Sequence, residues 1–294
     1  MSSGEKDRKD MIQRRAYAKI NLGLDVIRRR EDGYHEVRMI MQTVDLYDIL
    51  FFTRREEAGI FVTTDRTELP GDESNLVYRA ARLIADTYGI GQGLRIDLQK
   101  NIPMAAGMAG GSSDAAAVFH GMNEIFALNM SEEEMCRLGV RIGADVPYCI
   151  LGGTALAEGI GERLTRLRDA PQCFLLIAKP DIDVSTKSVY DSLQTDRLEH
   201  HPDIDGMRAA IESGSLRGMA ERMENVLETV TEKRYPIIAQ LKKFMKDRGA
   251  LNALMSGSGP TVFGVFETES AAGEAYEELK SRNVVRQVFL SALI

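Results

Sequence analysis

The sequence predicts an α+β protein, and three observations support this fold class. The chain has 294 residues, a length that suits two domains or one large one, and 44% of them are hydrophobic, which is ample for a buried core. Segments in which apolar and polar residues alternate, as in strands, occur beside segments with helical spacing. Both kinds occur in each half of the chain. We predict domains at 11–155 and 156–294, with residues 1–10 as a disordered tail.

Composition excludes several classes of function. A net charge of −7 argues against a nucleic-acid or anionic-membrane partner. Cys136, Cys149 and Cys173 have no C-x-x-C spacing, so we expect reduced core thiols in a cytoplasmic protein. No apolar run is long enough to cross a bilayer, and the polar residues 1–10 do not form a signal peptide.

The first predicted element is a half-buried strand over residues 12–26, where apolar and polar residues alternate. Lys19 and Asn21 are neighbours on its polar face. The ordinary interpretation of such a face is exposure to solvent. The small residues Ala18 and Gly23 leave room for a ligand, which is the alternative.

A turn at residues 31–35 follows, and it displays Tyr34 beside His35. Taken alone, these are a packing aromatic and a surface imidazole. A second alternating strand begins at Val37 and reaches Thr43.

Further strands of a meander are expected at 50–52 and 60–63. Ser74 is expected to cap a helix over 76–88, where apolar residues recur at helical spacing. A strand over 94–98 then leads into a glycine-rich loop.

That loop, residues 102–111, combines Pro103 with three glycines and little side-chain bulk. Residues of N-cap type and three alanines follow, which predicts a helix from Ser112 to about Phe126. A bare loop before a helix offers free N–H groups and the positive end of the helix dipole, which together bind anions such as phosphate. The alternative is a flexible loop that happens to precede a helix.

A second helix begins with the capping box of Ser131 and Glu134 and is expected to end at Gly143. Asp145 then stands between apolar neighbours, and Pro147 restricts the backbone that follows. Such a carboxylate is either a turn cap or a positioned catalytic base, and the local sequence alone favours the cap.

The second half of the chain continues as a mixture of strands and helices. We expect His200 and His201 to be solvated loop residues, because no further ligands stand at metal-binding spacing. The expected elements are a glycine hairpin region at 152–161, a buried strand at 174–178, a short helix after 184–190, helices at 204–213, 216–231 and 236–249, two strands around a glycine turn at 253–266, a helix at 270–282 and a strand at 284–290.

Several nucleotide-binding motifs are absent, including the P-loop, the dinucleotide fingerprint after a strand, and the protein-kinase HRD and DFG motifs. Three segments remain, in this order: Ala-Tyr-Ala-Lys-Ile-Asn at 16–21, P-x-x-x-G-x-x-G-G-S-S-D-A-A at 103–116, and Ser-Gly-Ser-Gly-Pro-Thr at 256–261. Together they resemble the GHMP kinase superfamily, and the resemblance covers all but the first ten residues. Met108 and Ala109 depart from its usual leucine and glycine. We expect Ala109 to be tolerated with a negative φ.

The segments Asp-Gly-Tyr-His at 32–35 and Gly-Ala-Asp-Val-Pro at 143–147 narrow the resemblance. They are similar to members that phosphorylate the 2-hydroxyl of a cytidine diphosphate-linked sugar alcohol in the non-mevalonate route to isoprenoid precursors. The resemblance implies a two-domain GHMP kinase fold with the active site in the cleft between the domains. It also implies ATP and Mg²⁺ as cofactors, no metal held by the protein alone, small-molecule substrates, and a monomer or weak homodimer.

The resemblance also implies roles for individual residues. Asp145 would accept the hydroxyl proton, and Lys19 would stabilise the attacking oxygen. Tyr34 and Tyr190 would stack on cytosine, and His35 would recognise its polar edge. The full implied sets are, for ATP, Asn75, Leu76, Val77, Lys100, Pro103, Ala106, Gly107, Met108, Ala109, Gly110, Gly111, Ser112 and Ser113, and for the acceptor, Asn21, Tyr34, His35, Thr186 and Tyr190.

Two other functions remain open. Another GHMP kinase, of the homoserine or mevalonate type, would share the loop but would have no need for an aromatic–imidazole pair. A non-catalytic ligand sensor would keep the loop and lose the base, yet Asp145 and Lys19 are both present.

Overall fold

A computed structural model describes residues 11–294, so the expected tail lies outside the described residues. The described chain forms two compact units, each built from several segments. Unit 1 contains the residues up to Ala18, 46–102 and 109–151, and unit 2 contains 19–45, 103–108 and 152–294. The predicted domains are continuous in sequence, and their boundary at 155/156 stays a prediction.

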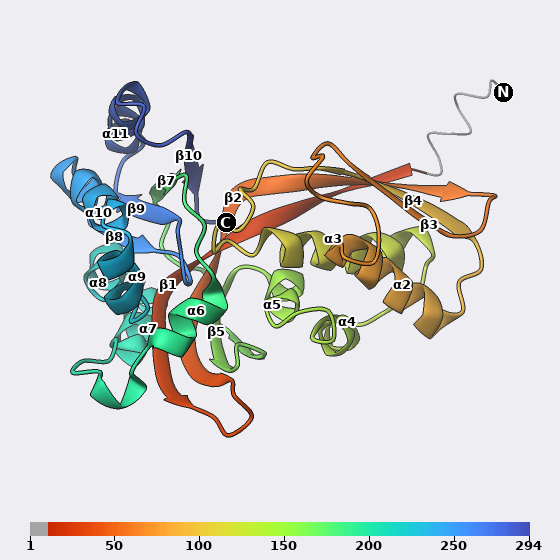
Figure 1. Cartoon of the computed structure of the whole chain (residues 1–294), viewed down its shortest axis with the longest axis horizontal. Coiled ribbons are helices and arrows are strands. Elements are labelled where there is room, and N and C mark those ends of the chain that lie inside the picture. Colours follow the sequence, from red (N-terminus) through yellow and green to blue (C-terminus); the bar gives the residue numbers. More distant parts are fainter. Residues whose placement is uncertain (1–10) are drawn as a thin grey trace. The chain divides into compact units, whose positions relative to one another are not determined.

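Two long strands contribute to both units, β1 (Met11–Arg29) and β2 (His35–Arg55), seen as the red and orange ribbons of Figure 1. In unit 1 the end of β2 pairs antiparallel with β4 (Gly93–Gln99), and β3 (Ile60–Thr64) pairs with the far side of β4. The β3–β4 pairing is parallel, so the predicted meander is wrong. Parallel neighbours need a crossover, and the helix at 76–88 supplies it.

The helices of unit 1 pack on its sheet around one hydrophobic core. Gly121 shows how close this packing is, because a Cβ there would lie 2.5 Å from the ring of Phe52. The helices are α2 (Leu76–Tyr88), α3 (Gly110–Ile125), α4 (Glu132–Gly139) and α5 (Val146–Leu151).

Two helix caps test the local reading of the sequence. The cap of α4 is confirmed, because the Ser131 hydroxyl accepts from Glu134 N–H at 3.2 Å. The cap of α2 is Asn75, whose Oδ1 accepts from Val77 N–H at 2.9 Å, and not Ser74. Ser74 instead donates its hydroxyl to Asp72, so a competing local hydrogen bond decided the boundary.

Unit 2 contains the start of β2, which pairs antiparallel with β5, and β5 forms a hairpin with β6 in the predicted region. A second, fully antiparallel sheet has the order β10-β7-β9-β8, and α10 and α11 pack against it. These elements are β5 (Thr154–Gly159), β6 (Arg163–Arg166), β7 (Phe174–Lys179), α10 (Ile237–Asp247), β8 (Asn252–Met255), β9 (Val262–Phe266), α11 (Glu269–Ser281) and β10 (Gln287–Ala292).

The single helix predicted over 216–231 is wrong, because the chain there forms two helices with an extended segment between them. Residues around Asn225 form a parallel bridge with Leu24 of β1. Leu24 N–H donates to Glu224 O at 2.9 Å, and Val226 N–H donates to Leu24 O at 3.0 Å. The helices of this part are α6 (Thr186–Ser192), α7 (Ile204–Glu212), α8 (Leu216–Glu221) and α9 (Glu228–Arg234).

The cysteines and the paired histidines differ in part from expectation. All three cysteines are free, but only Cys173 is fully buried, and burial raises the pKa of its thiol to about 12. His200 and His201 are exposed, as predicted, but each contacts a carboxylate, Glu224 at 2.9 Å and Asp25 at 2.8 Å. No helix within residues 11–294 is long and apolar enough to span a bilayer.

Candidate active site

The glycine loop ends at a helix N-terminus whose cap uses no side chain. Helix α3 begins at Gly110, two residues earlier than predicted, and Ala109 occupies the N-cap position without a side-chain hydrogen bond. The serines at 112 and 113 therefore lie inside the first turn and do not cap it. The first N–H groups of a helix have no partner within the helix, so this end of α3 is suited to an anion.

Ala109 has φ +55°, in the left-handed region, so the expected negative φ is wrong. The left-handed conformation costs an L-residue with a Cβ roughly 1–2 kcal/mol. The chain accepts this cost where it enters α3.

Replacing Ala109 by glycine should therefore stabilise the protein by about 0.5–1 kcal/mol, because relief of the left-handed strain exceeds the entropy that glycine adds to the unfolded chain. Urea unfolding measures the change. Ala116→Gly, in the interior of the same helix, is the control and should destabilise by about 1 kcal/mol. A lower midpoint for Ala109→Gly than for the parent would contradict the strain argument.

The first turn of α3 contacts other predicted site segments of unit 1. Ser113 donates its hydroxyl to Tyr17 O at 2.5 Å. A Cβ on Gly143 would lie 3.8 Å from the Ser112 hydroxyl, so Ser112 is next to the turn that carries Asp145. These contacts bring the loop end and the predicted base into one unit.

Asp145 directly precedes α5, a six-residue helix that the sequence did not predict. Its carbonyl accepts from Cys149 N–H at 3.0 Å, which gives Asp145 the N-cap position, and its side chain is half-buried. Pro147 is compatible with the first turn of a helix, where its missing N–H is not needed. The cap interpretation and the base interpretation are therefore compatible in geometry.

Lys100 lies in a buried cluster next to the first turns of α3. Its ammonium group donates to Asp114 at 2.7 Å and to Asp48, and all three side chains are at most 4% exposed. Asp48 also accepts from the N–H groups of Asn101 and Ile102, at 2.5 and 2.8 Å. The second oxygen of Asp114 has no hydrogen-bond partner among the described residues.

Burial raises the pKa of Asp114, and the two carboxylates raise the pKa of Lys100 although burial acts against it. The cluster joins β2, the end of β4 and α3. The ammonium group of Lys100 already donates to both carboxylates of this cluster. A contact of Lys100 with ATP stays a prediction.

Three of the residues predicted to bind ATP, Asn75, Leu76 and Val77, lie beside the start of α3. Asn75 caps α2 and donates to Pro70 O at 2.8 Å. A Cβ on Gly111 would lie 3.4 Å from Leu76, so α2 and α3 meet here. Val77 is fully buried in the core.

In unit 2, β1 is buried on both faces from Lys19 to Val26, so the predicted half-buried strand is wrong here. Of the two interpretations of its polar face, exposure to solvent does not hold for Lys19 and Asn21. Lys19 donates to Asn21 Oδ1 at 2.8 Å, and Asn21 donates to the sulfur of Met39 at 3.2 Å. The N–H of Lys19 donates to Met108 O at 3.1 Å. This last bond joins the first half of the glycine loop, residues 103–108, to β1.

Among the predicted acceptor residues, His35 is buried, Tyr190 is half-buried and Tyr34 is exposed. The ring of His35 lies 5.1 Å from the ring of Tyr190, with 43° between the planes, and burial lowers the pKa of His35. Tyr34 is 60% exposed. Thr186, at the start of α6, contacts the Ser258 hydroxyl at 2.8 Å.

Contacts of the turn at 256–261 were missed by sequence reasoning, although the motif itself was noted. The Ser256 hydroxyl donates to Gly107 O at 2.9 Å, and Gly107 has φ +72°. The repeated Ser-Gly was the available signal, but it did not indicate which loop the serines contact.

The structure therefore divides the predicted residues between its two units. Their arrangement as one site stays a prediction. Unit 1 holds Asn75, Leu76, Val77, Lys100, Ala109, Gly110, Gly111, Ser112, Ser113 and Asp145, and unit 2 holds Lys19, Asn21, Tyr34, His35, Pro103, Ala106, Gly107, Met108, Thr186 and Tyr190.

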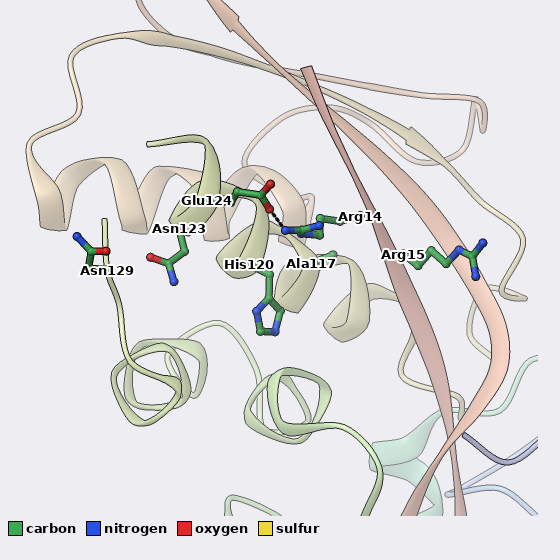
Figure 2. Close-up of a pocket in the computed structure, with 7 residues that line it drawn as sticks. All are labelled: Arg14, Arg15, Ala117, His120, Asn123, Glu124 and Asn129. Carbon is green, nitrogen blue, oxygen red and sulfur yellow. Dashed lines mark ion pairs between the residues drawn. The ribbon is translucent and has the colours of Figure 1, made fainter. Parts of the chain in front are cut away.

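A separate pocket in unit 1 contains none of the predicted residues. Figure 2 shows it beside α3, with Arg14 paired to Glu124 and Arg15 directed away from them. His120 lines it and contacts Ile150 O at 3.3 Å. Within residues 11–294 no group of three or more His, Cys, Asp or Glu side chains is arranged to hold a metal.

Comparison with known proteins assigns the family. The family model described as GHMP kinases N terminal domain matches residues 75–153, and that described as GHMP kinases C terminal matches 207–285. These matches confirm the α+β fold with two GHMP kinase domains.

Curated relatives match nearly the whole chain. The chain is 54% identical over 280 residues to 4-diphosphocytidyl-2-C-methyl-D-erythritol kinase of Lachnospira eligens, covering 95% of this chain and 97% of the relative. It is 52% identical over 266 residues to the enzyme of that name from Caldicellulosiruptor bescii, covering 90% and 93%.

Solved structures of GHMP kinases have the same fold as this chain. A crystal structure of 4-(cytidine 5'-diphospho)-2C-methyl-D-erythritol kinase superposes with a TM-score of 0.83 at 33% identity, covering 96% of this chain and 99% of that one. Homoserine kinase from Cytophaga hutchinsonii, at 21% identity and a TM-score of 0.74 over 97% and 95%, shares the fold. The chain is thus a small-molecule kinase, and it belongs to the 4-diphosphocytidyl-2-C-methyl-D-erythritol kinase family of the GHMP kinases.

Proposed function

We propose that this protein transfers the γ-phosphoryl group of ATP to the 2-hydroxyl of 4-diphosphocytidyl-2-C-methyl-D-erythritol, in the non-mevalonate route to isoprenoid precursors. The observation that carries the proposal is the N-terminus of α3, which has no side-chain cap and follows a glycine loop. The acceptor is supported by 54% identity to a relative with that name.

The nucleotide would bind through backbone groups. The N–H groups of the first turn of α3 and the helix dipole favour the charge of a triphosphate. Mg²⁺ usually binds through phosphate oxygens, water and few protein ligands. The hydroxyl of Ser112 fits such an ion better than that of Ser113, which already donates to Tyr17 O.

Phosphoryl transfer needs positioning and charge stabilisation rather than covalent catalysis by the protein. The acceptor oxygen would form a bond to the γ-phosphorus while the bond to the β–γ bridging oxygen breaks and ADP leaves. Asp145 would take the hydroxyl proton. Lys19 would stabilise the charge on the attacking oxygen.

Recognition of the acceptor would use the aromatic groups of unit 2. His35 is buried, which lowers its pKa and favours the neutral imidazole at pH 7. A neutral imidazole can donate one hydrogen bond to cytosine or accept one from it. Tyr34 and Tyr190 would stack on the base, and Asn21 and Thr186 would orient the sugar alcohol. We further propose a cytoplasmic monomer or weak homodimer without nucleic-acid or membrane partners, in keeping with the net charge of −7.

A coupled assay of ADP release over a panel of acceptors tests the function. We expect ADP release with 4-diphosphocytidyl-2-C-methyl-D-erythritol and none above background with mevalonate or homoserine. Turnover of either of these at a comparable kcat/KM would assign the protein to another activity of the superfamily.

Gly111→Val tests the nucleotide site. Gly111 is exposed and a Cβ there makes only an ordinary contact with Leu76, so we expect the fold to persist while bulk obstructs the backbone groups of the first turn. The Kd for ATP, measured by calorimetry, should rise at least tenfold, about 1.4 kcal/mol. Gly273→Val in α11, where a Cβ would meet open space, is the control and should leave the Kd unchanged. An unchanged Kd for Gly111→Val would place the triphosphate elsewhere.

A further inference from the structure

We propose that Asn225 is a positioning residue for the kinase reaction, because it holds the turn at 256–260, which contacts both the glycine loop and helix α6. The inference rests on the proposed function, since its kinetic effects are those on ATP and on the acceptor. All the residues that carry it belong to unit 2.

The amide of Asn225 is fully used. The side chain is 2% exposed, and its Nδ2 donates to Met255 O and to Gly257 O, each at 2.8 Å. Its Oδ1 accepts from Leu227 N–H at 3.0 Å. Two carbonyls require a donor, so the amide has one orientation and no carboxylate can replace it.

The backbone of Asn225 is anchored to β1. The bridge to Leu24 uses two hydrogen bonds, from Leu24 N–H to Glu224 O and from Val226 N–H to Leu24 O. Strand β1 also carries Lys19. Asn225 therefore fixes the turn relative to the strand that presents the predicted catalytic lysine.

One branch of the turn contacts the glycine loop. The Ser256 hydroxyl donates to Gly107 O at 2.9 Å. A Cβ on Gly107 would lie 2.4 Å from Ser256 O, so the two backbones fit closely. A shift of the turn would therefore displace the loop that leads to Ala109 and α3.

The other branch contacts α6. The Ser258 hydroxyl lies 2.8 Å from the Thr186 hydroxyl, at the first residue of this helix. The same helix carries Tyr190, whose ring lies beside His35. One turn thus connects a segment predicted to bind ATP with a segment predicted to bind the acceptor.

Asn225→Asp tests the proposal, because it keeps the size of the side chain and replaces the donor by oxygen facing two carbonyls. We expect the KM for ATP and the KM for the acceptor each to rise at least fivefold. A loss of active protein would lower only the maximal rate and would not change either KM. A merely structural role would lower the active fraction and leave both KM values unchanged.

Asn252→Asp is the matched control. Asn252 also donates to two carbonyls, of Ala220 at 2.8 Å and Met223 at 3.1 Å, and accepts from Ala253 N–H at 2.9 Å. It does not hold the turn. We expect both of its KM values to stay within twofold of the parent, and equal KM changes in the two variants would overturn the proposal.

If Asn225→Asp does not fold, two variants that each remove one contact of the turn provide the test. Ser256→Ala should raise the KM for ATP more than that for the acceptor, and Ser258→Ala should do the reverse. Both variants with KM values within twofold of the parent would overturn the proposal.

Hydrogen–deuterium exchange without substrates separates this proposal from the proposed function. Asn225→Asp should speed exchange in peptides covering 104–108 and 256–261, and Asn252→Asp should not. A parent protein inactive on the cytidine diphosphate acceptor would refute the proposed function, whereas unchanged exchange in Asn225→Asp would refute the role of Asn225.

Discussion

Asp145→Asn should lower kcat by about 10²–10⁴-fold, because a positioned base contributes about that factor to proton transfer. The factor corresponds to roughly 3–5 kcal/mol of barrier. The dissociation constants for ATP and the acceptor should change less than tenfold, since the contacts proposed for cytosine and for the triphosphate do not involve this carboxylate. Steady-state kinetics and calorimetry measure the two quantities.

The substitution also separates the two interpretations of Asp145. Asn and Asp are nearly equal as N-caps, so Asp145→Asn preserves any cap of α5 while it removes the proton acceptor. We expect an unchanged melting temperature together with the collapse of kcat, and Lys19→Met should reproduce part of the kinetic loss. A variant that retains most of its kcat when chemistry limits the rate would leave Asp145 as a cap only.

Lys100→Met should destabilise the protein by about 3–5 kcal/mol at pH 7, because it leaves Asp48 and Asp114 buried without their cation. Their side chains are 0% and 3% exposed, so water cannot take its place. Urea unfolding measures the loss. Lys243→Met removes an exposed ion pair with Asp247 and is the control, with an expected change of less than about 1 kcal/mol.

The loss of stability caused by Lys100→Met should become smaller as the pH falls. Burial raises the pKa of Asp114 even in the parent protein, and without Lys100 its largest opposing influence is gone. The folded variant therefore binds more protons than the unfolded chain, whose aspartates titrate near pH 3.9, and acid favours the folded state of the variant relative to the parent. Lys100→Met combined with Asp114→Asn should recover part of the stability at pH 7. A difference between variant and parent that is the same at pH 5 and pH 7 would contradict this account.

The sequence predicted elements well where the signal is local. The cap at Ser131, the buried strand ending before Pro180 and the helix after Pro236 are all confirmed within a few residues. Each depends on residues within one or two turns of the chain, and such signals act before tertiary contacts form.

Predictions failed where distant residues decide the structure. The parallel pairing of β3 and β4 and the break in the helix at Asn225 both involve partners far apart in sequence. The ion pair of Lys100 with Asp48 is likewise a long-range contact that the sequence did not indicate. Spacing patterns do not encode such pairs. The φ of Ala109 was predicted wrongly for another reason. The loop imposes its left-handed conformation, and an alanine in a sequence does not indicate a positive φ.

The bridge between Leu24 and Asn225 has a consequence for how the protein is made. Translation proceeds at about 5–20 residues per second, so the segment around Asn225 emerges from the ribosome about 10–40 s after Leu24. Until then, the stretch of β1 that is fully buried in the finished protein has no complete set of partners. Its apolar residues lack these partners during that interval, so we expect unit 2 to be completed only near the end of synthesis.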